Sequence, residues 1–214
     1  MRGFTATDAA VLVFAKAPLP GRCKTRLVPR LGELGAARLQ ARLTARTLRT
    51  ARDAGFQVVE LHATPSRTHG LFAFYGKRLK VQIKKQAGSD LGERMFNALA
   101  RALRRHRAVI LIGTDCPALA PGDLRRAARL LRGGCDAVLA PAEDGGYALI
   151  GMRRVSAELF SGIAWGGPDV YAETVKKLAL AAYRWRALRT VWDLDRPADL
   201  ERLASLGLRS RRFF

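Results

Sequence analysis

Apolar residues along the chain fall into short runs that alternate with longer segments of helical periodicity. The run Ala108–Ile112 is the clearest, because five apolar residues in a row, three of them β-branched, predict a strand buried on both faces of a sheet. Further strands are predicted at residues 9–15, 56–63, 79–83, 136–141, 148–152 and 183–188. The chain is therefore expected to be organised around a sheet.

Helices are predicted between these runs. Within residues 32–54, Leu39, Leu43 and Thr47 recur every four residues and give the segment a face directed to the core. The other predicted helices span 69–75, 88–107, 121–133, 156–160, 168–181 and 197–206. Strands that alternate with helices predict an α/β fold, a three-layer α/β/α sandwich with a mostly parallel sheet. No linker or repeat divides the chain, so we expect residues 1–214 to form one domain.

The residues directly after the buried strand give a first candidate site. Gly113 and Pro117 bracket a turn, and Asp115 between them lies at the carboxyl end of the strand, where open α/β sheets bind ligands. A carboxylate there can hold Mg²⁺ for a nucleotide diphosphate, because Mg²⁺ is usually held by one or two carboxylates plus substrate phosphates. The alternative is that Asp115 only completes a turn.

A basic loop after the first predicted strand is a second candidate. Two prolines and a glycine prevent a helix from following the strand directly. Four cations fall within eleven residues, namely Lys16, Arg22, Lys24 and Arg26; Gly21 lets the backbone turn close to a ligand, and Thr25 offers a hydroxyl and an amide. Such a loop can clamp phosphates and offset charge on a leaving diphosphate, although it matches neither the Walker A nor the GxGxxG pattern. The alternative is an ordinary basic surface loop.

A third candidate combines two carboxylates with paired glycines. The segment consists of Glu143, Asp144, Gly145, Gly146 and Tyr147. Paired glycines beside carboxylates suit a tight turn where the backbone approaches a sugar or a base. The alternative is a plain hairpin turn, because Asp-Gly is the commonest hairpin signal.

Two carboxylates near the carboxyl end of the sequence form the fourth candidate. Asp193 and Asp195 occupy alternate positions, so on a strand both would face the same side and could reach a metal. The alternative is that they cap the helix that follows Pro197. Among the aromatic residues, Trp165 lies in a glycine-rich loop and could stack on a ligand, although a role in the core is the competing interpretation.

The composition is that of a globular protein, with 49% hydrophobic and 26% charged residues. The net charge of +20 permits nucleic-acid binding and would also favour a polyanionic substrate such as a nucleotide. The surplus arginines are spread over several predicted helices, and the chain has neither repeated RNP-type aromatics nor zinc-finger spacing. We therefore do not expect nucleic acid to be the partner.

The apolar runs are too short to span a bilayer, and the N-terminal run is a poor signal peptide because a lysine and a proline end it after seven residues. Three widely spaced cysteines, Cys23, Cys116 and Cys135, fit neither a disulfide framework nor a zinc site. We therefore expect the reduced environment of the cytoplasm. The sequence carries no signal for an oligomeric state.

Five stretches occur here in the order found in one protein family. They lie at residues 14–27, 90–95, 113–117, 141–147 and 193–195. Over roughly residues 10–205 the chain resembles the DUF2064 family, also described as "transferase 1, rSAM/selenodomain-associated", of the nucleotide-diphospho-sugar transferase (GT-A) superfamily. Its Lys-Thr-Arg-Leu and Asp-x-Asp elements are also similar to those of the 2-phospholactate and molybdenum-cofactor guanylyltransferase groups.

This resemblance implies a Rossmann-like GT-A fold and a transferase that depends on Mg²⁺ or Mn²⁺. Its expected partners are a nucleotide or nucleotide-sugar donor and a small-molecule acceptor, with glycosyl transfer from a nucleoside-diphosphate sugar as the expected reaction. Asp115 and Asp195 would hold the metal. Lys24 would act on the phosphates during catalysis, and Asp144 or Glu143 would deprotonate the acceptor.

The resemblance also implies a set of binding residues. The nucleotide and its phosphates would contact Lys16, Gly21, Lys24, Thr25, Arg26 and Arg94, and the substrate would contact Gly145, Gly146, Tyr147 and Trp165. A nucleotidyltransferase that joins an NTP to a phosphorylated acceptor is the alternative enzyme, and a basic RNA-binding module is the non-enzymatic alternative. The chain departs from the family at Arg196, where relatives often have Thr, which raises the question of what caps the last predicted helix.

Overall fold

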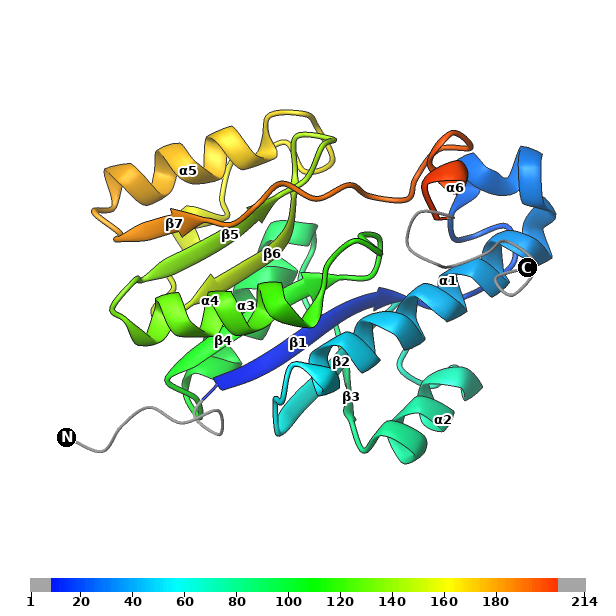
Figure 1. The fold of residues 1–214 in the computed structure, drawn as a ribbon, viewed down its shortest axis with the longest axis horizontal. Coiled ribbons are helices and arrows are strands. Elements are labelled where there is room, and N and C mark those ends of the chain that lie inside the picture. Colours follow the sequence, from blue (N-terminus) through cyan, green and yellow to red (C-terminus); the bar gives the residue numbers. More distant parts are fainter. Residues whose placement is uncertain (1–8, 204–214) are drawn as a thin grey trace.

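The structure, a computed structural model, describes residues 9–203 and has a seven-stranded sheet at its centre (Figure 1). The strands are β1 (Ala9–Lys16), β2 (Val58–Thr64), β3 (Gln82–Lys85), β4 (Ala108–Gly113), β5 (Ala137–Pro141), β6 (Tyr147–Met152) and β7 (Trp185–Ala187). Their order across the sheet is β3-β2-β1-β4-β6-β5-β7. Only β6 is antiparallel to its neighbours, β4 and β5. The prediction of a mostly parallel sheet is confirmed.

Helices cover both faces of this sheet. They are α1 (Val28–Asp53), α2 (Gly70–Leu79), α3 (Leu91–Leu103), α4 (Pro121–Arg132), α5 (Val170–Leu180) and the short α6 (Asp199–Arg202), with 3₁₀ turns η2 (Thr25–Leu27) and η3 (Ala157–Leu159). Buried residues of α1, α2 and α4 share one core cluster, and those of α3 and α5 share another. The three-layer α/β/α sandwich is therefore confirmed. No helix within residues 9–203 is both long and apolar enough to cross a membrane.

The central strand β1 shows how alternation builds the two core layers. Val11 and Val13 belong to the cluster under α1 and α4, whereas Leu12 and Phe14 belong to the cluster under α3. All seven residues Ala9–Ala15 are buried, as a strand with helices on both faces requires. Its neighbour β4 is equally apolar, so the two strands form a rigid base for the loops at their carboxyl ends.

A third, smaller core cluster lies where the loop after β1 meets the C-terminal segment. It joins Leu27 of η2 to two leucines of α1 and to the segment after β7; its buried members are Leu27, Leu39, Leu43, Trp192, Leu194 and Leu203. Figure 1 shows this C-terminal segment, in orange, crossing the molecule to reach α6 beside the blue loop that precedes α1. Apolar packing thus brings the basic loop close to the segment that carries Asp193 and Asp195.

Several element boundaries differ from the sequence prediction. α1 begins at Val28, with Pro29 in its first turn, and continues through a kink at Gly32 (φ 69°, ψ 167°), where the sequence placed the start of the helix. The loop 142–146 joins the antiparallel strands β5 and β6, so its backbone is a hairpin turn. The last predicted helix appears as α6, and its predicted end at residue 206 lies outside the described residues. The single-domain prediction stays a prediction.

Part of the arginine surplus has a structural role. Arg46 Nε donates to the carbonyl of Pro117 at 3.0 Å, and Arg125 Nη1 donates to the carbonyl of Asp53 at 3.1 Å. Arg52 donates to several carbonyls near the end of α2, including that of Leu79 at 3.2 Å. Guanidinium groups so placed satisfy carbonyls that have no partner inside a helix. These arginines therefore connect helices to neighbouring segments of the chain.

Candidate functional site

The carboxyl ends of β1 and β4 lie next to each other. The two strands are parallel neighbours, with Phe14 opposite Gly113 near their ends. The basic loop follows β1 and the Asp115 turn follows β4, so both leave the sheet at the same edge. This is the edge where ligands bind in open α/β sheets.

Lys24 links the basic loop to Asp115 and to the C-terminal segment. Its Nζ lies 2.8 Å from Asp115 Oδ1 and also donates to the carbonyl of Leu194, 170 residues away in the sequence. The amide of Leu194 in turn donates to the carbonyl of Asp115 at 2.7 Å. The Lys24 side chain is only 4% exposed, whereas that of Asp115 is 58% exposed. Lys24 is therefore held in place, while Asp115 remains accessible.

The backbone of Lys24 supports this placement. Its φ of 48° and ψ of 42° lie in the left-handed region, which non-glycine residues adopt rarely and often at functional sites. The next residue, Thr25, begins η2 and is exposed, and Leu27 closes η2 inside the third core cluster. The left-handed turn thus points the lysine inward, while the neighbouring leucine anchors the loop.

Arg26 and Asp195 form a second ion pair at this edge. Arg26 Nη1 bonds to Asp195 Oδ2, and the two side chains are 67% and 33% exposed. The backbone of Asp195 is fixed from the other side, because Asp199 Oδ2 accepts from the amides of Asp195 at 3.0 Å and of Arg196 at 2.6 Å. Asp199 thus satisfies two amides that precede α6, whose N-cap residue, Ala198, makes no side-chain hydrogen bond. Sequence reasoning missed it, although a carboxylate that reaches back to an amide three residues earlier is half of a capping box.

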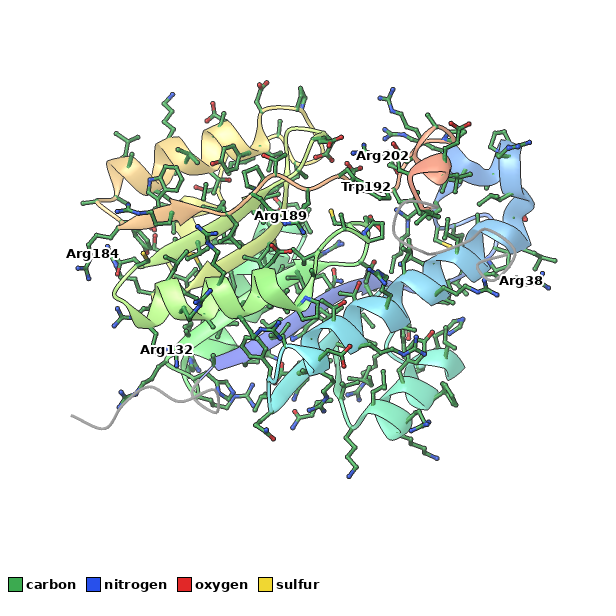
Figure 2. The ribbon with its side chains drawn as sticks, viewed as in Figure 1. Arg38, Arg132, Arg184, Arg189, Trp192 and Arg202 are labelled. Atoms are coloured by element: carbon green, nitrogen blue, oxygen red, sulfur yellow. The ribbon has the colours of Figure 1, made fainter. Side chains whose placement is uncertain are left out.

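The two carboxylates of the hairpin differ in their partners. Both oxygens of Glu143 accept from Arg202, at 2.7 and 2.9 Å, and this hydrogen bonding lowers the pKa of Glu143. Arg202 also lies over the ring of Trp192 at 4.6 Å, and Figure 2 shows the two side by side. Asp144 is exposed, and its Oδ1 accepts from the amide of Gly146 at 2.9 Å. Asp144 is therefore the carboxylate with capacity for a ligand.

Gly145 is required by close packing in this hairpin. Its φ of 88° is disfavoured for other residues, and a Cβ there would lie 1.8 Å from the carbonyl oxygen of Pro168. The amide of Tyr171 donates to the carbonyl of Gly145 at 2.8 Å. The segment from Pro168 to the first turn of α5 therefore fixes the position of the hairpin that carries Asp144.

Tyr147 and Trp165 are directed into protein rather than toward the ion pairs. The hydroxyl of Tyr147 lies 4.0 Å from Met95 Sδ, and burial raises the pKa of this phenol. Trp165 stacks on Phe160 with ring centroids 6.3 Å apart, and a Cβ on Gly92 would be 2.4 Å from its Nε1. Trp165 therefore packs against the start of α3, which favours a role in the core over stacking on a ligand.

The remaining predicted binding residues lie at this edge or behind it. Lys16 is the exposed last residue of β1, and Gly21 turns the basic loop with a φ of 70°. Arg94 donates to the carbonyls of Gly88 at 3.0 Å and Ser89 at 3.3 Å. It thus shapes the loop that precedes α3. Phosphate binding by Arg94 stays a prediction.

Carboxylate charge accumulates around Cys116. Burial raises the pKa of this thiol well above its ordinary value, and the charges of Asp115, Asp193 and Asp144 raise it further, in that order. Burial also raises the pKa of Asp193, with Asp144 the next contributor. Asp193 therefore belongs with the carboxylates at this edge. The Asp-x-Asp spacing predicts that both Asp193 and Asp195 could reach a metal, whereas the resemblance implies that role for Asp195.

The chemistry of these side chains fits a divalent cation held jointly with a substrate. Within residues 9–203, no three His, Cys, Asp or Glu side chains are grouped so that they could hold a metal on their own. Accessible carboxylates such as those of Asp115 and Asp195 suit Mg²⁺ or Mn²⁺, because these cations take oxygen ligands and share them with phosphates. Two protein carboxylates and a diphosphate would complete the ligand set.

Fold and site together define a Rossmann-like α/β protein with a charged site at the carboxyl edge of a mostly parallel sheet. Residues 44–167 match the family model DUF2064, described as an uncharacterised protein conserved in bacteria. The match spans more than half of the chain, which therefore belongs to the DUF2064 family. The resemblance read from the motifs is confirmed.

Solved structures extend the comparison to nearly the whole chain. One is described as a "putative nucleotide-diphospho-sugar transferase" from Desulfovibrio desulfuricans G20; it is 32% identical with a TM-score of 0.86, over 95% of this chain and 89% of that chain. Rv0371c from Mycobacterium tuberculosis H37Rv, in complex with manganese, is 20% identical (TM-score 0.56; coverage 93% and 99%). A CMP:2-keto-3-deoxy-manno-octonic acid synthetase with CTP is 14% identical (TM-score 0.58; coverage 94% and 98%) and, like Rv0371c, shares the fold. A search of curated proteins finds no match.

Proposed function

We propose that this protein is a divalent-metal-dependent transferase that moves a glycosyl group from a nucleoside-diphosphate sugar to a hydroxyl of a small acceptor. One observation carries the proposal: the basic loop and two accessible carboxylates meet at the carboxyl edge of the sheet. Lys24 Nζ lies 2.8 Å from Asp115 Oδ1, and Arg26 pairs with Asp195. Cations and carboxylates placed together suit a metal-bound diphosphate, because the phosphates bind the cations and the metal binds both kinds of oxygen.

Each charged residue has a distinct task in this proposal. Asp115 and Asp195 would hold a divalent cation, which when bound would neutralise charge on the departing diphosphate. Lys24, held by Leu194 at the inner side of the site, would donate to a phosphate oxygen from a fixed position. Arg26 and Lys16 would add donors from the solvent side. Donors fixed before the reaction stabilise developing charge without the cost of reorientation.

Asp144 would be the base in this reaction. The acceptor hydroxyl would lose its proton to the Asp144 carboxylate while its oxygen forms a bond to the anomeric carbon of the sugar. The bond between that carbon and the diphosphate oxygen breaks, and the nucleoside diphosphate leaves with the electron pair. Glu143 is less suited to this task, because Arg202 occupies both of its oxygens.

The relative from Desulfovibrio desulfuricans supports the transferase class. It is 32% identical over 95% of this chain, and its description names nucleotide-diphospho-sugar transfer. The manganese complex of Rv0371c supports a divalent cation through the shared fold only. Nucleotidyl transfer is the second candidate, since cations and carboxylates at the same edge would equally serve in-line displacement at the α-phosphate of an NTP.

The leaving group separates these candidates. The protein is incubated with Mg²⁺ or Mn²⁺ and either NDP-sugars or NTPs, each with a pool of hydroxyl and phosphorylated acceptors. Release of a nucleoside diphosphate supports glycosyl transfer, and release of pyrophosphate supports the nucleotidyl alternative. Tight binding of long RNA that weakens steeply with salt, with no response to Mg²⁺ and nucleotides, would contradict both.

A further inference from the structure

Both proposed metal carboxylates are paired with cations of a single loop. Lys24 contacts Asp115, and Arg26, two residues later, bonds to Asp195. The carboxylates proposed for the metal and the cations proposed for the phosphates thus neutralise each other. A metal-bound diphosphate can reach all of them only if at least one of these pairs exchanges its partner.

The two pairs differ in how firmly they are built. The Lys24 side chain is buried and bound twice, by Asp115 and by the carbonyl of Leu194. Asp115 keeps an accessible oxygen, because Lys24 contacts only its Oδ1 and the side chain is largely exposed. A metal could therefore bind Asp115 without displacing Lys24.

The Arg26–Asp195 pair has the opposite properties. The arginine side chain is largely exposed and bonds to Asp195. Ion pairs in contact with water contribute little to stability, so this pair can open at small cost. The backbones on both sides are fixed, since Leu27 is buried in the third core cluster and Asp199 holds the amide of Asp195. Only the side chain of Arg26 has to move.

We propose that Arg26 is an exchange residue that couples cation binding to phosphate binding. Its guanidinium neutralises Asp195, leaves it when that carboxylate binds a divalent cation, and then donates to the diphosphate. The inference rests on the proposed function above, in which Asp195 holds a metal and Arg26 meets phosphate. It adds that cation binding and diphosphate binding favour each other. Each ligand breaks the Arg26–Asp195 pair, so the other ligand no longer has to. By linkage the two ligands must raise each other's affinity by the same factor.

Single-ligand titrations test this exchange without measuring activity. Mn²⁺ alone is titrated by electron paramagnetic resonance, and pyrophosphate alone is titrated by calorimetry with a chelator present, since pyrophosphate carries the phosphates without requiring a particular base. Arg26→Gln should bind Mn²⁺ about two- to fivefold more tightly than the wild type, because Asp195 no longer has a competing partner. It should bind pyrophosphate more weakly, because a phosphate donor is lost.

Asp195→Asn gives the complementary result. It should bind Mn²⁺ at least tenfold more weakly, because a metal ligand is lost. Without metal it should bind pyrophosphate about two- to fivefold more tightly, because Arg26 is released. Each variant has a matched control near the same loop: Arg22→Gln removes an exposed positive charge, and Glu33→Gln removes an exposed negative charge beside Gly21. The controls measure the effect of charge alone.

Four outcomes would overturn the exchange. Arg26→Gln could raise Mn²⁺ affinity no more than Arg22→Gln does, or Asp195→Asn could change pyrophosphate affinity no more than Glu33→Gln does; in either case Arg26 does not compete with ligands. If the wild type bound neither Mn²⁺ nor any nucleoside diphosphate, the proposed function itself would fail, and the exchange with it. Metal-dependent nucleotide binding that Arg26→Gln leaves unaltered would refute the exchange and leave the function standing.

Discussion

Two clusters of charged side chains lie in the parallel part of the fold and differ in burial and in the partners of their carboxylates. The edge cluster consists of two ion pairs, Lys24 with Asp115 and Arg26 with Asp195, beside the carboxyl ends of β1 and β4. The buried cluster consists of Glu60, His62 and Arg105. Glu60 and His62 lie on β2 and are 2% and 3% exposed. One oxygen of Glu60 contacts His62 Nε2 and the other accepts from Arg105 Nη2, both at 2.9 Å.

The difference separates a structural cluster from a binding site. Burial raises the pKa of Glu60, but the hydrogen bonds and charges of His62 and Arg105 outweigh it and bring that pKa down to about 2. A buried carboxylate with both oxygens satisfied has no capacity for a ligand. In the edge cluster Asp115 is largely exposed and contacts Lys24 through one oxygen. A binding site is therefore distinguished by carboxylate oxygens that can still take a ligand, rather than by charge alone. Substitutions in the edge cluster should alter ligand binding, and substitutions in the buried cluster should lower stability.

Asp144→Asn should give the largest effect, because it removes the proposed base and keeps the shape of the side chain. We expect kcat to fall about 100- to 1,000-fold, within the usual range for general-base catalysis. The asparagine oxygen can still accept from the amide of Gly146, so the hairpin should persist. Steady-state kinetics with the identified donor measures kcat, and circular dichroism checks the fold. Unchanged kcat would exclude Asp144 as the base.

Asp115→Asn tests the edge cluster by binding. We expect metal-dependent affinity for a nucleoside diphosphate to fall about 100-fold, because a neutral amide is a poor ligand for Mg²⁺. The melting temperature should fall less than for Glu60→Gln, because the Asp115 side chain is mostly exposed and asparagine still offers Lys24 an oxygen. Calorimetry with and without Mg²⁺ measures the affinity. Wild-type affinity in this variant would refute the metal role of Asp115.

Glu60→Gln should show the reverse pattern. We expect the free energy of unfolding to fall by about 2–3 kcal/mol at pH 7, because Arg105 and His62 lose their charged partner in a buried position. For a chain of this size that corresponds to a melting temperature lower by roughly 5–10 °C. Nucleotide binding should match the wild type. A loss of binding without a loss of stability would mean that the buried cluster serves the site.

The same residue sets a pH dependence. The pKa of Glu60 is lower in the folded protein, at about 2, than its ordinary value of 4.5. Its stabilising contribution is therefore complete above pH 4.5 and disappears as the pH falls toward 2, a change of about 3 kcal/mol. Denaturant unfolding between pH 6 and 3 should show a shallower loss of stability for Glu60→Gln than for the wild type. Parallel curves would contradict the shifted pKa.

The sequence predicted the edge cluster better than the buried one, for a physical reason. Asp115 and the basic loop follow parallel strands, and the carboxyl ends of adjacent parallel strands must meet. Glu60 and His62 occupy alternate positions of β2, a pattern that in the sequence is typical of a solvent-exposed face. Both side chains are buried in the structure, and Arg105, which follows α3, pairs with Glu60. The contact of Lys24 with Leu194 depends on the third core cluster, which no local pattern encodes.

Glu143→Gln should give the smallest effect and tests whether satisfied partners, rather than burial, decide the role of a carboxylate. Glu143 lies in the hairpin next to the proposed base, yet Arg202 of α6 occupies both of its oxygens. We expect the melting temperature to change little, since the pair is exposed to water. The kcat should stay within about twofold of the wild type, in contrast to Asp144→Asn. A loss of kcat comparable to that of Asp144→Asn would show that Glu143 leaves Arg202 during the reaction, and the base would then have to be reassigned.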